Sequence, residues 1–591
     1  MTIETLITDH IDIWSSAQQT RSTAGRGSNG KIDLYGIKKL RELILELAVR
    51  GKLVPQDPND EPASELLKRI AAEKAELVKQ GKIKKQKPLP EISEDEKPFE
   101  LPEGWEWITL SEIATINPKI EVTDDEQEIS FVPMPCISTR FDGAHDQEIK
   151  KWGEVKKGYT HFADGDIALA KITPCFENSK AVIFKGLKGG VGVGTTELHV
   201  ARPISSELNL QYILLNIKSP HYLSMGESMM TGSAGQKRVP RSFFENYPIP
   251  FPPNTEQTRI VGTFSKLMFL CDQLEQQSLI SLDAHQQLVE TLLATLTDSQ
   301  NAEELAENWA RISQHFDTLF TTEASIDALK QTILQLAVMG KLVPQDPNDE
   351  PASELLKRIE QEKAQLVKEG RIKKQKLLPP ISDDEKPFEL PEGWEWCRLE
   401  TITELITKGS SPKWQGVSYT DNPNDVLFIT SENVGSFKIL LDSEKYVEKK
   451  FNEIEPRSIL TRNDILMNIV GASIGRTAIF NMNRNANINQ AVCLIRVINN
   501  SMFLSYLLNF FNSDICLSYM FDKQVDNARA NLSMGNIAKF VLPIPPLNEQ
   551  KRIVKHIDNL MSICDKLQFH LQSVQQIQLH LADALTDAAL N

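Results

Sequence analysis

A tandem duplication constrains this chain more than any other feature of its sequence. The string GKLVPQDPNDEPASELLKRI at 51–70 recurs letter for letter at 340–359, and both copies continue to KPFELPEGWEW, which ends at Trp107 and Trp396. A second repeated block starts with PPNTEQTRIV at Pro252 and with PPLNEQKRIV at Pro545. Repeats of this length indicate two copies of one structural unit.

Each copy encloses a stretch that the other copy does not repeat. These stretches, 108–251 and 397–544, share little obvious similarity, so near-identical frames carry two divergent segments, called here the first and second inserts. The 591 residues predict about three to five structural units, at roughly 100–200 residues each. The duplication also predicts pseudo-twofold symmetry between the two copies.

The second repeated block has the periodicity of a coiled-coil helix. From Ile553 to Val574, apolar residues alternate spacings of four and three, which keeps one stripe facing a partner helix. The first copy follows this pattern until Ser278, where polar residues soften it. Shorter amphipathic helices are predicted at 40–49 and 329–338, each followed by a glycine. The residues predicted to pack the long helices are Ile260, Phe264, Leu267, Leu274, Ile553, Ile557, Leu560 and Leu567.

The inserts differ from the frames in composition. Short β-rich runs occur at 131–137, 181–184, 426–430, 478–480 and 491–497, bounded mostly by Gly, Asn or Asp. We therefore expect two mixed α/β globular domains and an α+β chain overall. The proline-rich linker before the first insert predicts one helix near 63–80, and the small, polar segment 17–33 is predicted to be mobile.

Charge and cysteine usage limit the class of protein. The net charge is −15, yet Lys and Arg against Asp and Glu number 15 against 17 in the first insert and 15 against 14 in the second. The acidic excess therefore lies on the frames, and a basic face on either insert stays possible. The seven cysteines form no CxxC pair, which argues against a zinc site or a disulfide framework. No apolar run reaches membrane-span length and no secretory signal is evident, so we expect a cytoplasmic protein.

Catalytic motifs are missing from the sequence. It contains no GxxxxGK[ST] phosphate loop and no NPPY-type motif of an adenine methyltransferase. The string GGVGVG at 189–194 is compatible with a cofactor loop, but its neighbours favour a glycine-rich turn into a strand. Acidic pairs such as Asp124–Asp125 lack a nuclease partner motif and are interpreted as solvated surface. We predict no catalytic residue and no metal site.

The chain resembles the specificity subunits of type I restriction–modification systems. The resemblance rests on the domain-closing strings YPIPFPPNTEQTRIV and VLPIPPLNEQKRIV and on the two LPEGWEW entries. Inside the inserts, DGDIALAKITPCFENSKAVIF and RNDILMNIVGASIGRTAIF resemble the internal GDI-type strand of that family. TGSAGQKRV at 231–239 resembles the segment before the closing motif, and DNARANLSM at 526–534 matches it more loosely.

The resemblance implies a function in DNA recognition. Each insert would be a target-recognition domain that contacts one half of a bipartite site in double-stranded DNA, and antiparallel coiled-coil helices would separate the two. The frames would bind two modification subunits, which carry S-adenosylmethionine, and restriction subunits with ATP and Mg²⁺ would join them. This chain would hold no cofactor. A helix of about 30 residues spans roughly 45 Å, somewhat more than one turn of B-DNA at ~34–36 Å.

The resulting domain prediction has seven parts. They are an N-terminal helical region at 1–50, linker frames at 51–107 and 340–396, target-recognition domains at 108–251 and 397–544, a central helical region at 252–339 and a C-terminal helix at 545–591.

Candidate DNA contacts are long or amide side chains in loop-like parts of the inserts. Base edges are contacted by Arg, Lys, Asn and Gln, and phosphates by Lys, Arg, Ser, Thr or backbone N–H groups. Gln236 suits adenine, and Arg238 suits guanine or phosphate. Each candidate could instead be an ordinary solvated surface residue without a role in DNA binding. The candidates are Arg140, Lys171, Thr173, Ser233, Gln236, Lys237 and Arg238 in the first insert, and Ser410, Lys413, Asn433, Asn468, Arg476, Arg529 and Asn531 in the second.

Other features leave two interpretations open. Tyr159 and Tyr419 could stack on a displaced base, although packing against the protein is the simpler explanation. The basic runs GKIKKQK and GRIKKQK could touch phosphates or form solvated linkers. The helix faces opposite the apolar seam could bind a partner subunit. At the level of the whole chain, the alternative to a specificity subunit is a coiled-coil scaffold without DNA specificity.

Overall fold

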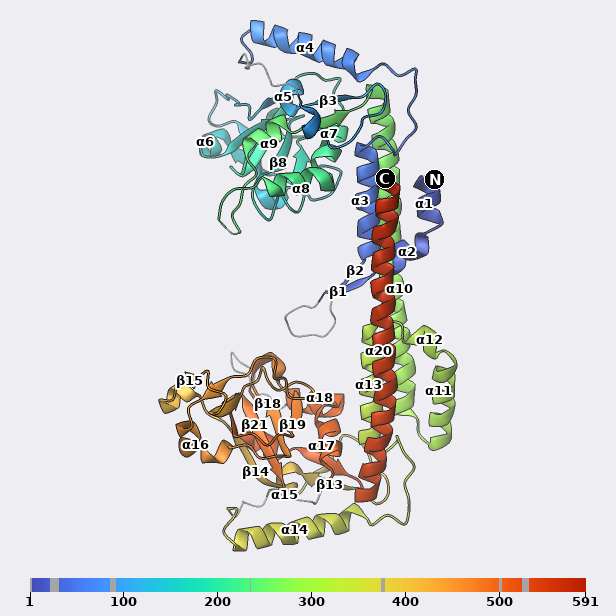
Figure 1. The fold of residues 1–591 in the computed structure, drawn as a ribbon, viewed down its shortest axis with the longest axis vertical. Coiled ribbons are helices and arrows are strands. Elements are labelled where there is room, and N and C mark those ends of the chain that lie inside the picture. The colour runs from blue at the N-terminus through green and yellow to red at the C-terminus, as the bar shows by residue number, and fades with distance from the viewer. Residues whose placement is uncertain are drawn as a thin grey trace. The chain divides into compact units, whose positions relative to one another are not determined.

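The computed structural model describes residues 3–21, 31–84, 92–233, 235–373, 378–498, 502–522 and 531–590. The chain divides into two compact units, each built around one insert. The first unit comprises Met1–Thr20, Ile32–Ile280 and Gln575–Asn591, and the second comprises Arg21–Lys31 and Ser281–Val574. Figure 1 labels many of the elements of both units.

Two long helices confirm the coiled-coil prediction for the closing blocks. They are α10 (Asn254–Asp298), which runs unbroken through the polar residues after Ser278, and α20 (Leu547–Leu590). Each unit combines the start of one helix with the end of the other, so the two helices run antiparallel. Of the predicted packing residues, Ile260, Phe264, Leu267, Ile553 and Ile557 are buried, and Leu274, Leu560 and Leu567 are half-buried.

Shorter helices complete the frames. They are α3 (Tyr35–Val49) and α4 (Ala63–Lys79) in the first copy, and α13 (Glu323–Val338) and α14 (Ala352–Lys368) in the second. Arg41 of α3 pairs with Asp272 of α10 at 2.5 Å, and Lys330 of α13 pairs with Asp565 of α20 at 2.8 Å. These pairs occupy equivalent positions in the two copies, so the duplication extends to side-chain contacts.

The ends of the long helices are held in the same way in both units. In the second unit, the Lys341 ammonium donates to the carbonyls of Thr297 and Ser299 at 2.6 and 2.9 Å, at the end of α10. In the first unit, the equivalent Lys52 donates to the carbonyl of Leu590 at 2.6 Å, at the end of α20. A cation at these carbonyls matches the negative end of the helix dipole.

The repeated E-Q-x-R motif locks the start of each long helix. Glu256 is buried and accepts hydrogen bonds from Trp105 Nε1 at 3.0 Å and from Gln56 Nε2 at 3.1 Å, while Arg259 pairs with Asp60 at 2.6 Å. Burial raises the pKa of Glu256, which these two donors oppose. In the second copy the corresponding residues are Glu549, Trp394, Gln345, Arg552 and Asp349.

Each insert enters and leaves through one two-stranded antiparallel ladder. In the first insert, β3 (Glu106–Ile108) pairs with β12 (Ile249–Phe251), and in the second, β13 (Glu395–Arg398) pairs with β22 (Val541–Ile544). The chain between these strands forms the insert, and its two ends therefore lie side by side at the frame.

The first insert contains two four-stranded sheets. One has the order β4-β11-β8-β9 and is antiparallel, and the other has the order β6-β5-β10-β7 with β5 and β10 parallel. The bounds are β4 (Ala114–Ile116), β5 (Glu128–Val132), β6 (Glu148–Lys151), β7 (Thr160–Ala163), β8 (Ile167–Ala170), β9 (Ala181–Ile183), β10 (Val191–Gly194) and β11 (Leu198–Pro203), with helices α5 (Leu110–Ile113), α6 (Trp152–Val155), α7 (Leu210–Ile217), α8 (Pro220–Ser228) and α9 (Arg241–Asn246).

The second insert repeats this topology despite its divergent sequence. Its antiparallel sheet has the order β14-β21-β18-β19, and its other sheet has the order β15-β17-β16-β20 with β16 and β20 parallel. The two inserts differ at the sheet edges, since β7 pairs with β10 only in the first insert and β15 pairs with β17 only in the second. The bounds are β14 (Thr403–Lys408), β15 (Tyr419–Thr420), β16 (Val426–Ile429), β17 (Tyr446–Val447), β18 (Asp464–Asn468), β19 (Thr477–Phe480), β20 (Ala486–Ile488) and β21 (Val492–Val497), with helices α15 (Leu399–Ile402), α16 (Lys450–Ile454), α17 (Leu504–Phe511), α18 (Asp514–Asp522) and α19 (Met534–Ala538).

A buried ion pair explains the GDI-type motif of the inserts. Asp464 is fully buried, forms a two-point pair with Arg496 of β21 at 2.7 Å, and accepts a hydrogen bond from the Thr461 backbone. Asp166 makes the same pair with Arg202 of β11. The residues before these aspartates, Gly165 and Asn463, have φ of 86° and 78°, a left-handed conformation that Gly and Asn adopt most readily.

The shorter predicted elements agree with the structure in part. The predicted β-rich runs contain strands, but the run at 131–137 leaves its strand after Val132 because Pro133 has no N–H to donate. The segment 17–33 includes two short paired strands, β1 (Gln19–Arg21) and β2 (Lys31–Asp33), and its residues 22–30 lie outside the described part. The other helices are α1 (Ile3–Thr8), α2 (Ile11–Ser16), α11 (Ala302–Gln314) and α12 (Phe316–Leu319).

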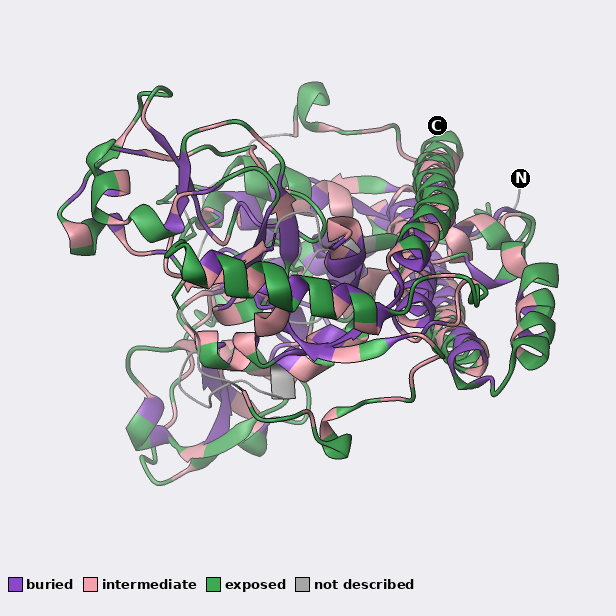
Figure 2. Cartoon of the chain, turned by 90° about the horizontal axis from the view of Figure 1, so that it is seen from below, coloured by how far each residue is buried: buried purple, intermediate pink, exposed green. Residues whose placement is uncertain are grey.

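Burial follows this architecture. Figure 2 shows the buried residues in the sheets of the inserts and on one side of the frame helices, with exposed residues on the outer turns. No helix in the described ranges is long and apolar enough to cross a bilayer. The α+β prediction of two mixed domains on long helices is confirmed.

We expect Asp464→Asn to lower the free energy of unfolding of the second insert by about 3 kcal/mol, because Arg496 loses its buried partner. Hydrogen exchange of peptides from β18 and β21 would measure the loss locally. Asp421→Asn, an exposed position of the same insert, is the matched control. Equal exchange in both variants would contradict the structural role of the pair.

Candidate nucleic-acid interface

A short hairpin projects from the first insert between α8 and α9. Thr231 and Arg238 exchange both backbone hydrogen bonds, at 3.1 and 2.8 Å, and close a loop that corresponds to the TGSAGQKRV string. Gly232 has φ of 127°, and a Cβ there would lie 2.8 Å from the Gln236 carbonyl oxygen. The loop therefore needs a glycine at this position. Residues 231–238, called here the recognition hairpin, are described except for Ala234.

The chain after β8 pairs with this hairpin and brings two further candidates to it. Val239 donates to the Lys171 carbonyl at 2.8 Å, and Thr173 donates its backbone N–H to the Lys237 carbonyl at 3.0 Å. Six of the seven candidates in the first insert thus lie together: Lys171, Thr173, Ser233, Gln236, Lys237 and Arg238. Arg140 lies on a separate loop, where it pairs with Asp142.

The electrostatics of the hairpin centre on one carboxylate. Glu197, just before β11, accepts two hydrogen bonds from Arg238, each at 2.9 Å. The Arg238 guanidinium holds the pKa of Glu197 below its usual value, and nearby Lys171 contributes in the same direction. Arg238 remains 43% exposed, and Ser233, Gln236 and Lys237 are exposed. The hairpin therefore presents donors and positive charge to solvent.

Thr173 differs from its neighbours. Its side chain is buried, and its hydroxyl has no hydrogen-bond partner among the described residues. In this conformation the hydroxyl cannot reach a DNA groove, so only the backbone of Thr173 contributes to the hairpin.

The second insert repeats the base of the hairpin. Leu532 donates to the Ile469 carbonyl at 3.0 Å. Asn531 forms an isolated antiparallel β-bridge with Val470, as Arg238 does with Ile172. Asn531 is exposed at the end of this loop. The candidate Arg529 lies outside the described residues.

Two candidates of the second insert are structural. Asn433 is buried, accepts from the Thr430 backbone and hydroxyl, and donates to two backbone carbonyls. Asn468 is fully buried at the end of β18 and donates to the carbonyls of Ser431 and Val434 at 2.9 and 3.1 Å. Neither amide can reach a groove edge, because both are used inside the domain, and we remove both from the candidate set. Their loop-like sequence context gave no sign of this burial.

The other candidates of the second insert remain at the surface. Ser410 is half-buried and accepts from Gln415 at 2.9 Å, Lys413 is exposed, and Arg476 is exposed without an ion pair in the described ranges. Beside Lys413 lies Trp414, which is 73% exposed and was not among the candidates. An exposed indole is a strong stacking surface for a nucleobase. A tryptophan between lysine and glutamine in the string SSPKWQG was the available signal.

The two tyrosines proposed for stacking pack partly on the protein. Tyr159 lies edge-on to Phe131 with ring centroids 5.2 Å apart, and Tyr419 lies edge-on to Phe428 at 5.9 Å. Both rings stay exposed on their outer side.

The glycine-rich string GGVGVG forms a strand rather than a phosphate loop. Val191–Gly194 is β10, which pairs on both sides within its sheet. A Cβ on Gly192 would lie 2.5 Å from the Phe162 ring, and one on Gly194 would lie 2.4 Å from the Val132 carbonyl oxygen. These glycines make room for Phe162, which stacks on Phe184. The preferred sequence interpretation is confirmed.

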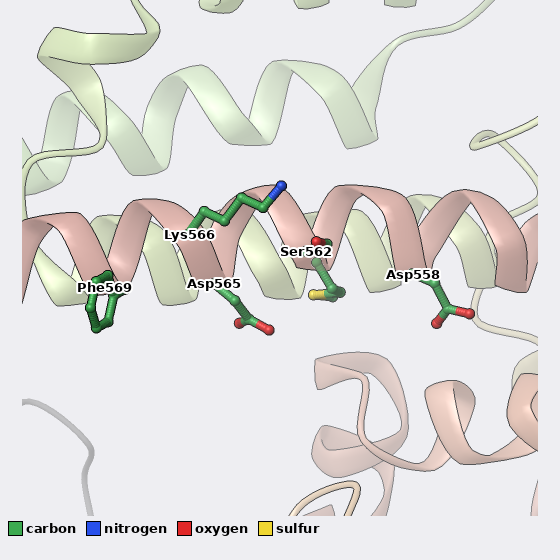
Figure 3. A pocket seen from close by; sticks show the side chains of 6 residues that line it. Asp558, Ser562, Asp565, Lys566 and Phe569 are labelled. Atoms are coloured by element: carbon green, nitrogen blue, oxygen red, sulfur yellow. The ribbon is translucent and has the colours of Figure 1, made fainter.

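The outer face of α20 carries a second kind of surface. Figure 3 shows Asp558, Asp565 and Phe569 projecting from one side of this helix. Met561 and Ser562 lie in the same stripe, and Phe569 is 73% exposed. Phe569 lies at one end of this stripe, one turn after Asp565, and exposed aromatic rings are typical of protein-binding faces.

Comparisons with known proteins agree with one another. The family described as "Type I restriction modification DNA specificity domain" matches residues 102–284 and 391–575. The type I restriction enzyme EcoEI specificity subunit of Escherichia coli is 72% identical over 603 residues, and the EcoAI specificity subunit of Escherichia coli is 64% identical over 612 residues. Both alignments cover 100% of this chain and 100% of the relative.

A solved structure shows the same fold. A chain from work on the complex assembly and conformational transition of the type I R-M system aligns with a TM-score of 0.52 and 17% identity. It covers 84% of this chain and 99% of that chain.

We expect Asn468→Ala to lower the free energy of unfolding by about 1–3 kcal/mol, because two buried carbonyls lose their donor. Thermal unfolding of the full chain measures this. Arg476→Ala, on the exposed turn that follows, should leave the unfolding temperature unchanged. A stable Asn468→Ala protein with altered DNA binding would restore Asn468 as a contact residue.

Proposed function

Because the chain belongs to the family of type I restriction enzyme specificity subunits, we propose that it directs a modification and restriction complex to a DNA site with two separated half-sites. Each insert would contact one half-site. The observation that carries this proposal is the pair of inserts, which share one topology and present different side chains on repeated frames. The alternative of a scaffold without DNA specificity leaves the divergence of the inserts unexplained.

The recognition hairpin is the strongest candidate for base contacts. Its backbone base is the same in both inserts, since Val239 and Leu532 make equivalent bonds to Lys171 and Ile469. The side chains at these positions differ, and different donors and acceptors select different base edges. Two domains of one fold can thus recognise two unrelated half-sites.

Contacts to DNA phosphates would supply affinity even though the net charge of the chain is −15. Lys171 and Lys237 lie at the hairpin, where Arg238 pairs with Glu197. Lys237 is exposed and forms no ion pair among the described residues, so its charge is available for DNA. Such contacts position a protein on the duplex and make binding salt-dependent.

Partner subunits would supply the chemistry. We infer that methyl transfer from S-adenosylmethionine belongs to two methyltransferase subunits, and ATP- and Mg²⁺-dependent restriction to further subunits, while this chain contributes no catalytic group. The repeated frames offer two equivalent binding sites to two copies of one partner. The exposed stripe of α20 around Phe569 is a candidate contact for such a subunit.

Methylation mapping tests the proposal directly. DNA is exposed to the partner methyltransferase with and without this chain, and modified positions are sequenced. We expect methylation at a single two-part motif only when the chain is present. If an active partner methylates the same positions with and without this chain, the scaffold interpretation would be favoured instead.

Exchange of one insert tests modular recognition. Residues 108–251 are replaced by the corresponding insert of a relative with another site, joined at the β3–β12 ladder. One half-site should change while the other persists, because the second insert keeps its own ladder. A change in both half-sites, or in neither, would contradict the proposal that each insert recognises one half-site independently.

A further inference from the structure

The donors of Arg238 are only partly used by the protein. A guanidinium has five N–H groups. Glu197 accepts from Nε and from Nη2, each at 2.9 Å, and the Gln236 carbonyl accepts from Nη1 at 3.1 Å. One N–H on Nη1 and one on Nη2 are left, and the side chain is 43% exposed. The free donors therefore form a fork at the end of the guanidinium.

Such a fork fits two acceptors that lie side by side. On DNA these are O6 and N7 of guanine in the major groove, or two oxygens of one phosphate. The Glu197 carboxylate, bound to the same guanidinium, repels a charged phosphate more strongly than the neutral edge of a base. Lys237 is exposed in the same hairpin and forms no ion pair among the described residues, so it suits a phosphate better. The charge distribution thus favours guanine for Arg238.

Glu197 also fixes where the fork points. A two-point pair with a carboxylate holds the guanidinium plane, so less side-chain entropy is lost on binding. The main chain is paired in the same way in both inserts. The Lys171 N–H donates to the Glu197 carbonyl, and the Ile469 N–H donates to the Ala491 carbonyl, at 2.9 Å in each case. The second insert has Ala491 and Asn531 where the first has Glu197 and Arg238. The acid–arginine pair therefore belongs to the first insert alone at these positions.

We propose that Glu197 positions Arg238 to contact a guanine in the half-site recognised by the first insert. Arg238 is the specificity-determining residue and Glu197 is its positioning residue. The proposal rests on the function proposed above and adds which base type one half-site must contain and why the other insert does not require it through this position.

The test uses the full chain assembled with its methyltransferase partner on a DNA library randomised over both half-sites. The variants are Arg238→Lys, which keeps charge but loses the fork, and Glu197→Gln, which keeps size but weakens the pair. We expect wild-type methylation to require guanine at one position of one half-site. Arg238→Lys should reduce discrimination there by about tenfold or more, and Glu197→Gln should reduce it partially at the same position only.

Controls separate this from folding and from the broader proposal. Arg241→Lys changes a nearby exposed arginine that pairs with Glu245 on α9, and it should leave the motif unchanged. The second half-site should stay intact in every variant, which reports a folded and assembled chain.

Two results would overturn the inference. One is a wild-type motif whose first-insert half-site contains no guanine, although its methylation is lost in the Arg238→Lys variant. The other is an Arg238→Lys variant that weakens all sequences equally and lowers the salt dependence by about one phosphate contact. Absence of any two-part motif with the wild-type chain would instead refute the proposed function itself.

Discussion

The closed ladder at the base of each insert is the constraint on which the rest of the structure depends. Because β3 pairs with β12 and β13 pairs with β22, both ends of an insert meet the frame at one place. The E-Q-x-R motif that follows ties the next helix to the entry tryptophan through Glu256 or Glu549. The repeated residues thus hold both ends of each insert, and the interior adds contacts of its own, such as the His221 backbone donating to Glu46 of α3.

The sequence predicted the frames better than the inserts. Heptad spacing and the exact repeat fixed the long helices because one apolar stripe needs only local periodicity. The common topology of the inserts was not predictable, since a sheet depends on distant pairings, such as β5 with β10, that leave no repeated letters. One shared signal was the aspartate of the GDI-type strand, whose arginine partner lies 36 residues further on in the first insert and 32 in the second.

The structure brings candidate residues together where they share one turn of the chain, and it places others in the domain interior. Six candidates of the first insert gather at the recognition hairpin because the glycines and the basic run of TGSAGQKRV belong to a single turn. Asn433 and Asn468 have the residue type of base readers, but they satisfy internal carbonyls. Trp414 was missed because an isolated tryptophan is usually a core residue, and its 73% exposure is visible only in three dimensions.

The hairpin base also bears on how such proteins change over generations. Its hydrogen bonds run between main-chain atoms, so they persist whatever side chains occupy positions 171, 197 and 238. Under the proposed function, single nucleotide changes at these codons would give a lineage a new target without the import of a foreign domain. Selection by invading DNA would then act on a few codons of the hairpin and of the strand that pairs with it.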